Sequence, residues 1–193
     1  MASAGEASMA AAERTDTRYF LPYDRDGLKA GLTVVADERG ICGFASVASP
    51  ARPDAWDCVG VTANSIYDPC FENPYAAGEM ACVASPFAGE VVRFSLTAPL
   101  EREKEGAVGA GEVSSGPADP WAMPWALELA NGERCQRLPA IDVVQAGQPV
   151  HYGCEGGGEI VGEADRSEPR WTVAYLEAGA VGTTLVDVVV AWS

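Results

Sequence analysis

Residues capable of general-base or nucleophilic chemistry are few and poorly arranged in this sequence. His151 is the single histidine among the 193 residues, so a Ser-His-Asp triad would have to use it. The Gly-x-Ser-x-Gly nucleophile motif is absent, and His151 stands beside Tyr152 in a segment typical of a strand. We therefore interpret His151 as an ordinary strand residue and predict no catalytic residue.

Carboxylates offer a second kind of chemistry, because paired acids hydrolyse glycosides and gathered acids bind calcium. The chain has 28 Asp and Glu residues, so pairs arise by chance. None of the local groups follows the Asp-x-Asp-x-Asp-Gly calcium loop, and the sequence predicts solvated charges, no metal and no cofactor. Two groups are close in sequence: Asp54, Asp57, Asp68 and Glu72, and then Glu163, Asp165 and Glu168.

Aromatic residues gather in the segment from Cys42 to Cys82, which also holds four of the six cysteines. Aromatic side chains on loops form apolar patches or stack on sugars. We therefore predict a ligand-binding surface there; the alternative is that these side chains pack beneath the loops. The candidate residues are Trp56, Tyr67, Asp68 and Phe71, with Tyr75 and Phe87 nearby.

The cysteines predict a disulfide framework. They lack the Cys-x-x-Cys spacing of zinc and thioredoxin-like sites, and their even number and wide spacing favour an oxidising compartment. Sequence alone does not choose the connectivity, and six reduced thiols in a cytosolic protein are the alternative. We expect sequential pairing, because each bridge then closes a short loop between predicted strands: Cys42 with Cys58, Cys70 with Cys82, and Cys135 with Cys154.

The charge of the chain restricts its partners. Lys and Arg number 13 against 28 acids, which gives a formal net charge of −15. Such a field repels nucleic-acid phosphates and anionic membrane surfaces, so we expect no nucleic-acid partner and no direct membrane insertion. A protein or a cell-wall glycan is the partner that remains.

Short strands separated by Gly and Pro turns predict the fold. Asn131-Gly132 is a strong type I′ hairpin signal, and residues 91–97 alternate like a half-buried strand. Residues 31–36 and 41–48 predict a hairpin whose turn is residues 37–40.

The predicted fold class is all-β: a disulfide-stabilised sandwich or partly open barrel with a loop-rich lobe between Cys42 and Cys82. Residues 64–75, which contain two prolines, are expected to form an ordered loop of this lobe. Residues 18–193 predict a single β domain, and residues 1–17 a disordered arm or linker, because they are small and polar with no periodic apolar face.

Four strings of residues support an exported protein: SVASPARPDAWDC, NSIYDPCF, PWALELANGERC and VHYGC. Together they resemble a group of uncharacterised secreted or lipoprotein-like proteins of Gram-positive bacteria, and the resemblance implies export and disulfides but no activity. The N-terminal residues lack the basic and apolar regions of a signal peptide, so we expect a leader or anchor to be missing from this sequence.

The function expected from the sequence is a non-enzymatic binding domain, extracellular or at the cell surface. A secreted, glycan-directed hydrolase using paired carboxylates is the alternative.

Overall fold

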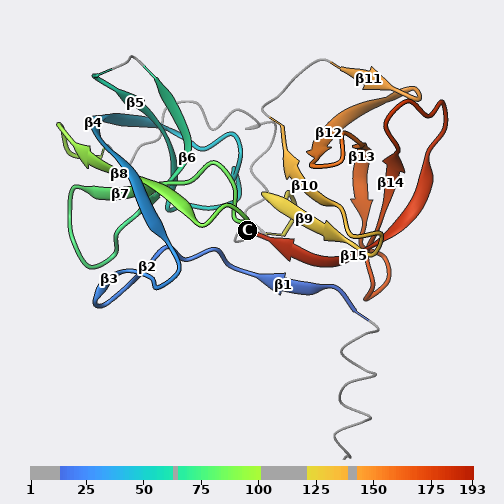
Figure 1. Ribbon diagram of the computed structural model, residues 1–193, viewed down its shortest axis with the longest axis horizontal. Coiled ribbons are helices and arrows are strands. Elements are labelled where there is room, and N and C mark those ends of the chain that lie inside the picture. The colour runs from blue at the N-terminus through green and yellow to red at the C-terminus, as the bar shows by residue number, and fades with distance from the viewer. Residues whose placement is uncertain (1–13, 63–64, 101–120, 139–142) are drawn as a thin grey trace, which may run out of the picture. The chain divides into compact units, whose positions relative to one another are not determined.

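The computed structural model describes residues 14–62, 65–100, 121–138 and 143–193, and every regular element in these ranges is a β-strand. The expected all-β class is therefore confirmed. The chain forms two compact units, and the single domain expected for residues 18–193 is organised as this pair (Figure 1). Unit 1 comprises Met1–Tyr19 with Pro124–Ser193, and unit 2 comprises Phe20–Met123. No helix of the described residues is long and apolar enough to cross a membrane.

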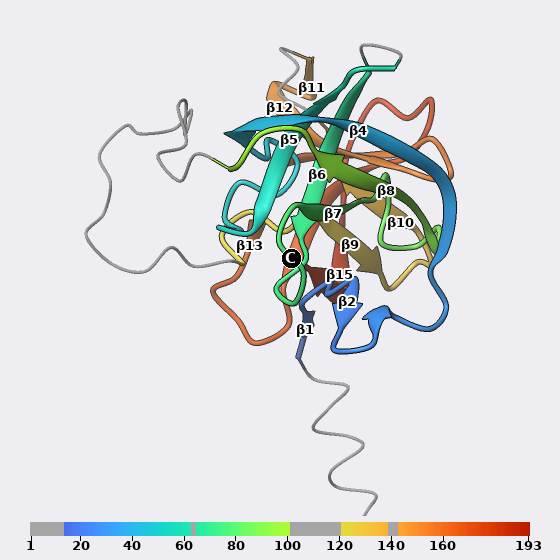
Figure 2. The same cartoon turned by 90° about the vertical axis from the view of Figure 1, so that its left-hand side faces the viewer.

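Unit 2 is built on a closed barrel of five strands, which Figure 2 shows with β4 curving across it. The long strand β4 closes the barrel because it has two partners: residues 33–40 run parallel to β8, and residues 40–45 run antiparallel to β5. A small β2–β3 ladder precedes it. The strands are β2 (Tyr23–Asp24), β3 (Gly27–Leu28), β4 (Thr33–Ala45), β5 (Ala55–Gly60), β6 (Ile66–Glu72), β7 (Glu79–Cys82) and β8 (Glu90–Leu96).

The predicted hairpin with a turn at residues 37–40 is wrong, because these residues lie in the middle of β4. Two features keep the strand continuous. The buried carboxylate of Glu38 accepts hydrogen bonds from the Thr62 hydroxyl (2.6 Å) and the Arg39 N–H (2.8 Å), which offsets the cost of burying a charge. Gly40 meets the backbone of Val59 so closely that a Cβ atom would clash with it.

The loop predicted for residues 64–75 is also wrong over most of its length, because residues 66–72 form β6 between β5 and β7. Pro69 is tolerated within β6 because the β5–β6 register shifts there, so no ladder hydrogen bond is demanded of its nitrogen. Barrel strands therefore make up about half of the segment between Cys42 and Cys82, and connecting segments make up the rest.

The interior of the barrel holds aromatic side chains and sulfur atoms. Trp56, Met80 and Phe94 are fully buried among the two disulfides of this unit. The Sγ atom of Cys42 lies 3.3 Å from the Sδ atom of Met80. The unit is thus tied covalently through the centre of its core.

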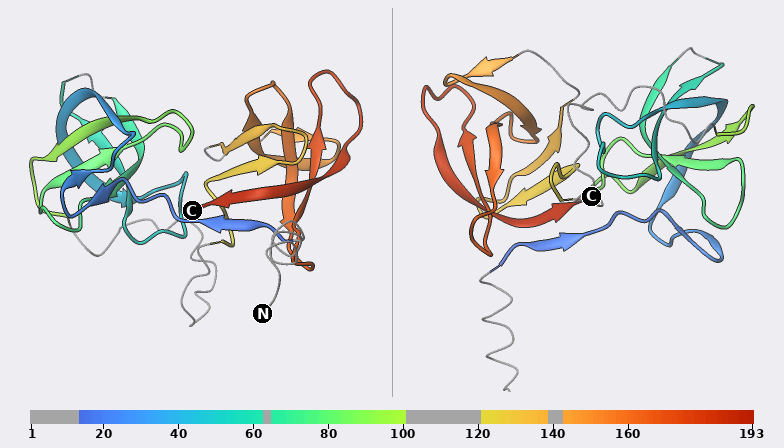
Figure 3. Two further views of the ribbon diagram at one scale, coloured as in Figure 1. Left: turned by 60° about the horizontal axis from the view of Figure 1, so that its bottom comes forward. Right: turned by 180° about the vertical axis from the view of Figure 1, so that it is seen from behind.

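Unit 1 is a six-stranded ring, closed where β15 pairs with β9 (Figure 3). Leu127, Tyr152, Ile160 and Val188 are among the buried side chains that fill it. The strands follow the order β9, β10, β12, β13, β14, β15, with β11 paired to β12 and β1 to β15. Their bounds are β1 (Asp16–Arg18), β9 (Ala126–Leu129), β10 (Arg134–Arg137), β11 (Val144–Gln145), β12 (Gln148–Cys154), β13 (Glu159–Asp165), β14 (Thr172–Leu176) and β15 (Thr184–Trp192).

The disordered arm expected for residues 1–17 is wrong for residues 14–17, which are ordered in unit 1. Residues 1–13 lie outside the described part of the chain. Strand β1 runs parallel to β15, from Asp16 opposite Val190 to Arg18 opposite Trp192. The buried hydroxyl of Thr15 donates to the Val188 carbonyl (2.7 Å) and accepts from the Trp171 N–H (2.9 Å). The partners come from the other end of the sequence, which is why local composition gave no sign of them.

All three disulfides have the sequential pairing that we expected: Cys42–Cys58, Cys70–Cys82 and Cys135–Cys154. Each joins two residues that lie directly opposite one another on neighbouring antiparallel strands. The third bridge follows the hairpin at Asn131-Gly132, which is confirmed. Its turn is not the expected type I′, because Gly132 has a φ of 90° but Asn131 has no positive φ. Three such bridges indicate an oxidising, extracellular-type environment.

Candidate binding site at the end of the five-stranded barrel

The four predicted binding residues do not form one exposed surface. Trp56 and Phe71 are buried, so neither ring is available to a ligand. Tyr67 is partly buried and packs edge-on against Phe94, with 5.7 Å between ring centroids. Asp68 uses Oδ2 to accept the backbone N–H groups of Val47 and Ala48, each at 3.0 Å. Trp56, Tyr67 and Phe71 therefore pack in the interior of the barrel unit, which is the alternative that the sequence left open.

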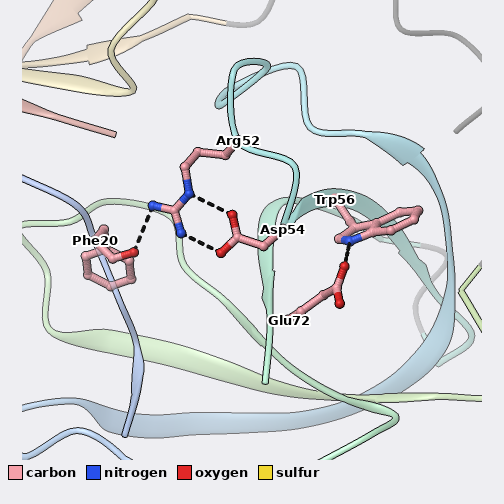
Figure 4. A network of polar contacts seen from close by, with 5 residues as sticks. All are labelled: Phe20, Arg52, Asp54, Trp56 and Glu72. Atoms are coloured by element: carbon pink, nitrogen blue, oxygen red, sulfur yellow. Dashed lines mark hydrogen bonds and ion pairs between the residues drawn. The ribbon is translucent and has the colours of Figure 1, made fainter. Parts of the chain in front are cut away.

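Arg52 organises the segment that leads into β5 (Figure 4). Its guanidinium group is almost fully buried and donates two hydrogen bonds to the Asp54 carboxylate, at 2.7 and 2.6 Å. A third goes to the Phe20 carbonyl at 3.0 Å, and the guanidinium lies 4.9 Å from the Phe71 ring centroid. The Asp54 carbonyl in turn accepts the N–H of Glu72 (3.0 Å), so this network fixes the end of β6.

Glu72 links the core of the barrel to its end. Its Oε1 atom accepts the indole N–H of the buried Trp56 at 2.7 Å (Figure 4). The indole donor is satisfied in this way, and the carboxylate is held at the end of the barrel.

A hollow of about 700 Å³ opens where Glu72 lies. Residues 72–80 and 96–100 line it, and we call it the barrel-end hollow. All of these residues belong to unit 2. A smaller cavity of about 130 Å³ shares Glu72 and Pro74 with it, so Glu72 borders both.

The turn at residues 73–78 forms one wall and is held by its own hydrogen bonds. The Asn73 side-chain oxygen accepts the N–H groups of Tyr75 (2.9 Å) and Ala76 (3.2 Å), an Asx turn. Gly78 has a φ of 83°, and its carbonyl accepts the Leu96 N–H at 2.8 Å. This wall is therefore held by hydrogen bonds within the chain, while Tyr75 remains 57% exposed.

The charges around the hollow are negative. Glu72 and Glu79 are its charged lining residues, and none of the described lining residues is Lys, Arg or His. Glu79 accepts a hydrogen bond from the Asn73 amide at 3.2 Å. Burial raises the pKa of the Tyr23 phenol, and the neighbouring Glu79 carboxylate raises it further. The hollow thus combines an apolar surface with two carboxylates.

These two carboxylates have different hydrogen-bond partners, the Trp56 indole for Glu72 and the Asn73 amide for Glu79. Glycoside hydrolysis needs two carboxyl groups that face one another across the scissile bond. In Glu72 and in Glu79, one carboxylate oxygen is already engaged by a hydrogen bond within the chain. His151 belongs to unit 1, where its Nε2 atom lies 3.4 Å from Glu163 Oε1.

Three of the four acids considered for calcium near the barrel have separate partners, and Asp57 lies near Asp68. Asp54 pairs with Arg52, Glu72 with Trp56, and Asp68 with backbone N–H groups. The sulfur atoms of Cys58, Cys70 and Cys82 lie within 4.8 Å of one another, but each of these cysteines is in a disulfide.

Comparison of the chain with protein-family models, curated proteins and solved structures finds no match. The site must therefore be interpreted from its own geometry. Sequence reasoning singled out Glu72 as an acid and Tyr75 as an aromatic residue, but it missed Asn73, Glu79 and the segment at residues 96–100. The Asn-Pro-Tyr turn before β7 was a usable local signal for Asn73, whereas the approach of residues 96–100 depends on the pairing of β7 with β8.

Proposed function

We propose that this protein is a non-enzymatic binding protein of the cell surface or extracellular space, and that it binds its ligand in the barrel-end hollow. The observation that carries the proposal is a fixed, ligand-sized hollow with a carboxylate anchored at its edge. Its volume of about 700 Å³ lies within the range of roughly 300–1,000 Å³ that is common for small-molecule sites. The mouth of a β-barrel is a frequent place for such a site.

The lining favours a ligand that combines a flat apolar face with a positively charged group. Tyr75 offers an exposed ring for stacking, as aromatic residues do with sugars. Glu72 and Glu79 supply negative charge with no cation among the described lining residues. An amino sugar of a cell-wall glycan has both features, and the three disulfides support an environment in which such a glycan is present.

The test is calorimetric titration of the full chain with glucosamine oligomers and with their N-acetylated, uncharged counterparts. We expect the glucosamine oligomer to bind about fivefold more tightly, because one ion pair contributes roughly 1 kcal/mol at a partly exposed site. If both oligomers bind with equal affinity, the carboxylates do not select a positively charged ligand. If neither oligomer binds, the proposal of a glycan ligand is wrong.

Two substitutions place the binding in the hollow. Glu72→Gln keeps an oxygen for the Trp56 N–H but removes the charge, and Tyr75→Ala removes the exposed ring; each should weaken binding about five- to tenfold. Glu90→Gln is the matched control, because Glu90 is an exposed acid of the same unit outside the lining. If Glu90→Gln weakens binding as much as Glu72→Gln, the effect is general electrostatics and the site is elsewhere.

A further inference from the structure

The outside of the barrel wall of unit 2 carries a second surface of interest, where several large apolar side chains are exposed. Ile41 of β4, Val59 of β5 and Ile66 of β6 lie directly opposite one another across three adjacent strands. Ile66 is 71% exposed and Ile41 54% exposed. Since neighbouring strands are about 4.8 Å apart, this row spans about 10 Å.

The row continues along the strands in both directions. Phe44, which lies opposite Asp57, is 53% exposed, and Val47 follows it. Val61 is exposed at the other end, where its N–H bonds to the Arg39 carbonyl. We call these side chains the β4–β6 outer face: Ile41, Phe44, Val47, Val59, Val61 and Ile66. Neighbouring exposed apolar side chains of this kind often mark an interaction site, whereas exposed apolar residues scattered singly over a surface are normal.

Charges border the face unevenly. The exposed Arg39 lies at the Val61 end. Asp57 and Asp68 lie at the Phe44 end, on neighbouring strands, and neither forms an ion pair with a Lys, Arg or His of the described residues. The Oδ1 atom of Asp68 is buried without a hydrogen-bond donor among the described residues, and its Oδ2 atom accepts the N–H groups of Val47 and Ala48. Partial burial, together with the Asp68 charge, raises the pKa of Asp57. This end of the face therefore carries two acids that have no cationic partner among the described residues.

We propose that the β4–β6 outer face docks a partner polypeptide segment that presents apolar side chains together with Lys or Arg, the cation lying against Asp57 and attracted also by the negative charge of the neighbouring Asp68. Charge complementarity selects this occupant. A second copy of the chain would bring together two bodies with a net charge of −15 each, and a phosphate-bearing partner would meet the same repulsion.

The experiment uses dye-labelled hexapeptides with alternating Leu and Lys, and matched peptides with Glu in place of Lys, titrated with the full chain at physiological salt. Fluorescence anisotropy should show binding of the Leu/Lys peptide and at least tenfold weaker binding of the Leu/Glu peptide. Equal binding of both peptides would overturn the choice of a cationic partner.

Substitutions test whether the peptide binds at this face or is only attracted by the net negative charge of the protein. Ile66→Ser and Phe44→Ser should each weaken binding of the Leu/Lys peptide about tenfold, because each removes an apolar contact of the face. Leu185→Ser is the matched control: Leu185 is 78% exposed on β15 of unit 1, and its loss should leave binding unchanged. Asp57→Asn should weaken binding more than Asp187→Asn, which also removes an exposed acid of β15.

Three results would overturn the proposal. If Leu185→Ser acts like Ile66→Ser, the peptide binds apolar surface without preference. If Asp187→Asn acts like Asp57→Asn, only net charge is being sensed. If sedimentation shows a dimer that Ile66→Ser abolishes, the occupant is a second copy of the chain.

Discussion

At the residue scale, Arg52 illustrates how one buried charge organises a loop without serving chemistry. Its side chain is 3% exposed and makes a two-pronged pair with Asp54, which is 38% exposed. Removal of the guanidinium leaves Asp54 without its cation and the Phe20 carbonyl without its donor. A buried pair is costly to break from one side, although the exposure of Asp54 lowers that cost.

We therefore expect Arg52→Ala to lower the free energy of unfolding by about 2 kcal/mol, measured by urea denaturation. Arg18→Ala is the control, because the Arg18–Asp16 pair is about half exposed on both sides, and its loss should cost less than about 0.5 kcal/mol. Equal effects of the two substitutions would mean that the Arg52 network does not hold the structure.

Two acids of the barrel should give opposite dependences of stability on pH. Burial and then Asp68 raise the pKa of Asp57, so the folded state holds a proton more tightly than the unfolded state. Ionised Asp57 is thus destabilising at neutral pH, and this effect vanishes below the unfolded-state pKa of about 3.9. The Thr62 hydroxyl and then the Arg39 N–H lower the pKa of Glu38, so its carboxylate stabilises the fold above about pH 4.3 and loses this effect as the pH falls through the folded pKa.

Asp57→Asn should consequently raise the midpoint of urea unfolding at pH 7, and Glu38→Gln should lower it. Both differences from the unsubstituted chain should shrink as the pH falls: that of Asp57→Asn is lost below about pH 3.9, and that of Glu38→Gln only as the pH falls through the lowered pKa of folded Glu38. A difference that stays constant between pH 7 and pH 3 would show that packing, not charge, is responsible.

At the scale of elements, sequence patterns succeeded where the pairing is local. The Asn131-Gly132 turn brings β9 and β10 together within a few residues, and the alternation in β8 places Phe94 inside the barrel. Long-range parallel pairing carries no such local signal. Strand β4 is held by β8, and β1 by β15, so residues that look like a turn or an arm become strands.

The candidate site follows the same rule. Trp56 and Phe71 were visible as unusual residues, but whether they faced solvent depended on strand register and on the cover from Phe20 and Arg52. The sequential disulfides were predictable because each joins strands that are paired in space and close in sequence; two join consecutive strands, and the third joins β10 to β12 across the two-residue β11. The barrel-end hollow was not, since residues 72–80 and 96–100 meet only once β8 has paired with β7.

At the scale of the whole molecule, unit 2 is inserted into unit 1 between β1 and β9. Both points of insertion lie at the end of β15. Arg18, at the end of β1, is opposite Trp192 on one side, and Ala126, at the start of β9, is opposite Trp192 on the other. With neighbouring strands about 4.8 Å apart, the chain leaves unit 1 and returns to it at points about 10 Å apart. A ring whose ends are this close does not need the inserted residues in order to close.

Residues 20–123 expressed alone should therefore fold with the Cys42–Cys58 and Cys70–Cys82 bridges, and a chain in which about four Gly and Ser residues replace this segment should still close the six-stranded ring. Four extended residues span about 13 Å, which is enough for the gap.

Peptide mapping by mass spectrometry would check the bridges, and circular dichroism would check cooperative melting of each piece. As a control, a direct fusion of residue 19 to residue 124 with no linker should melt at a lower temperature, because it strains β1 away from Trp192. If residues 20–123 alone scramble their disulfides, or the linked ring melts without cooperativity, the two units depend on each other to fold, and binding at the barrel should then be lost whenever the ring of unit 1 is disrupted.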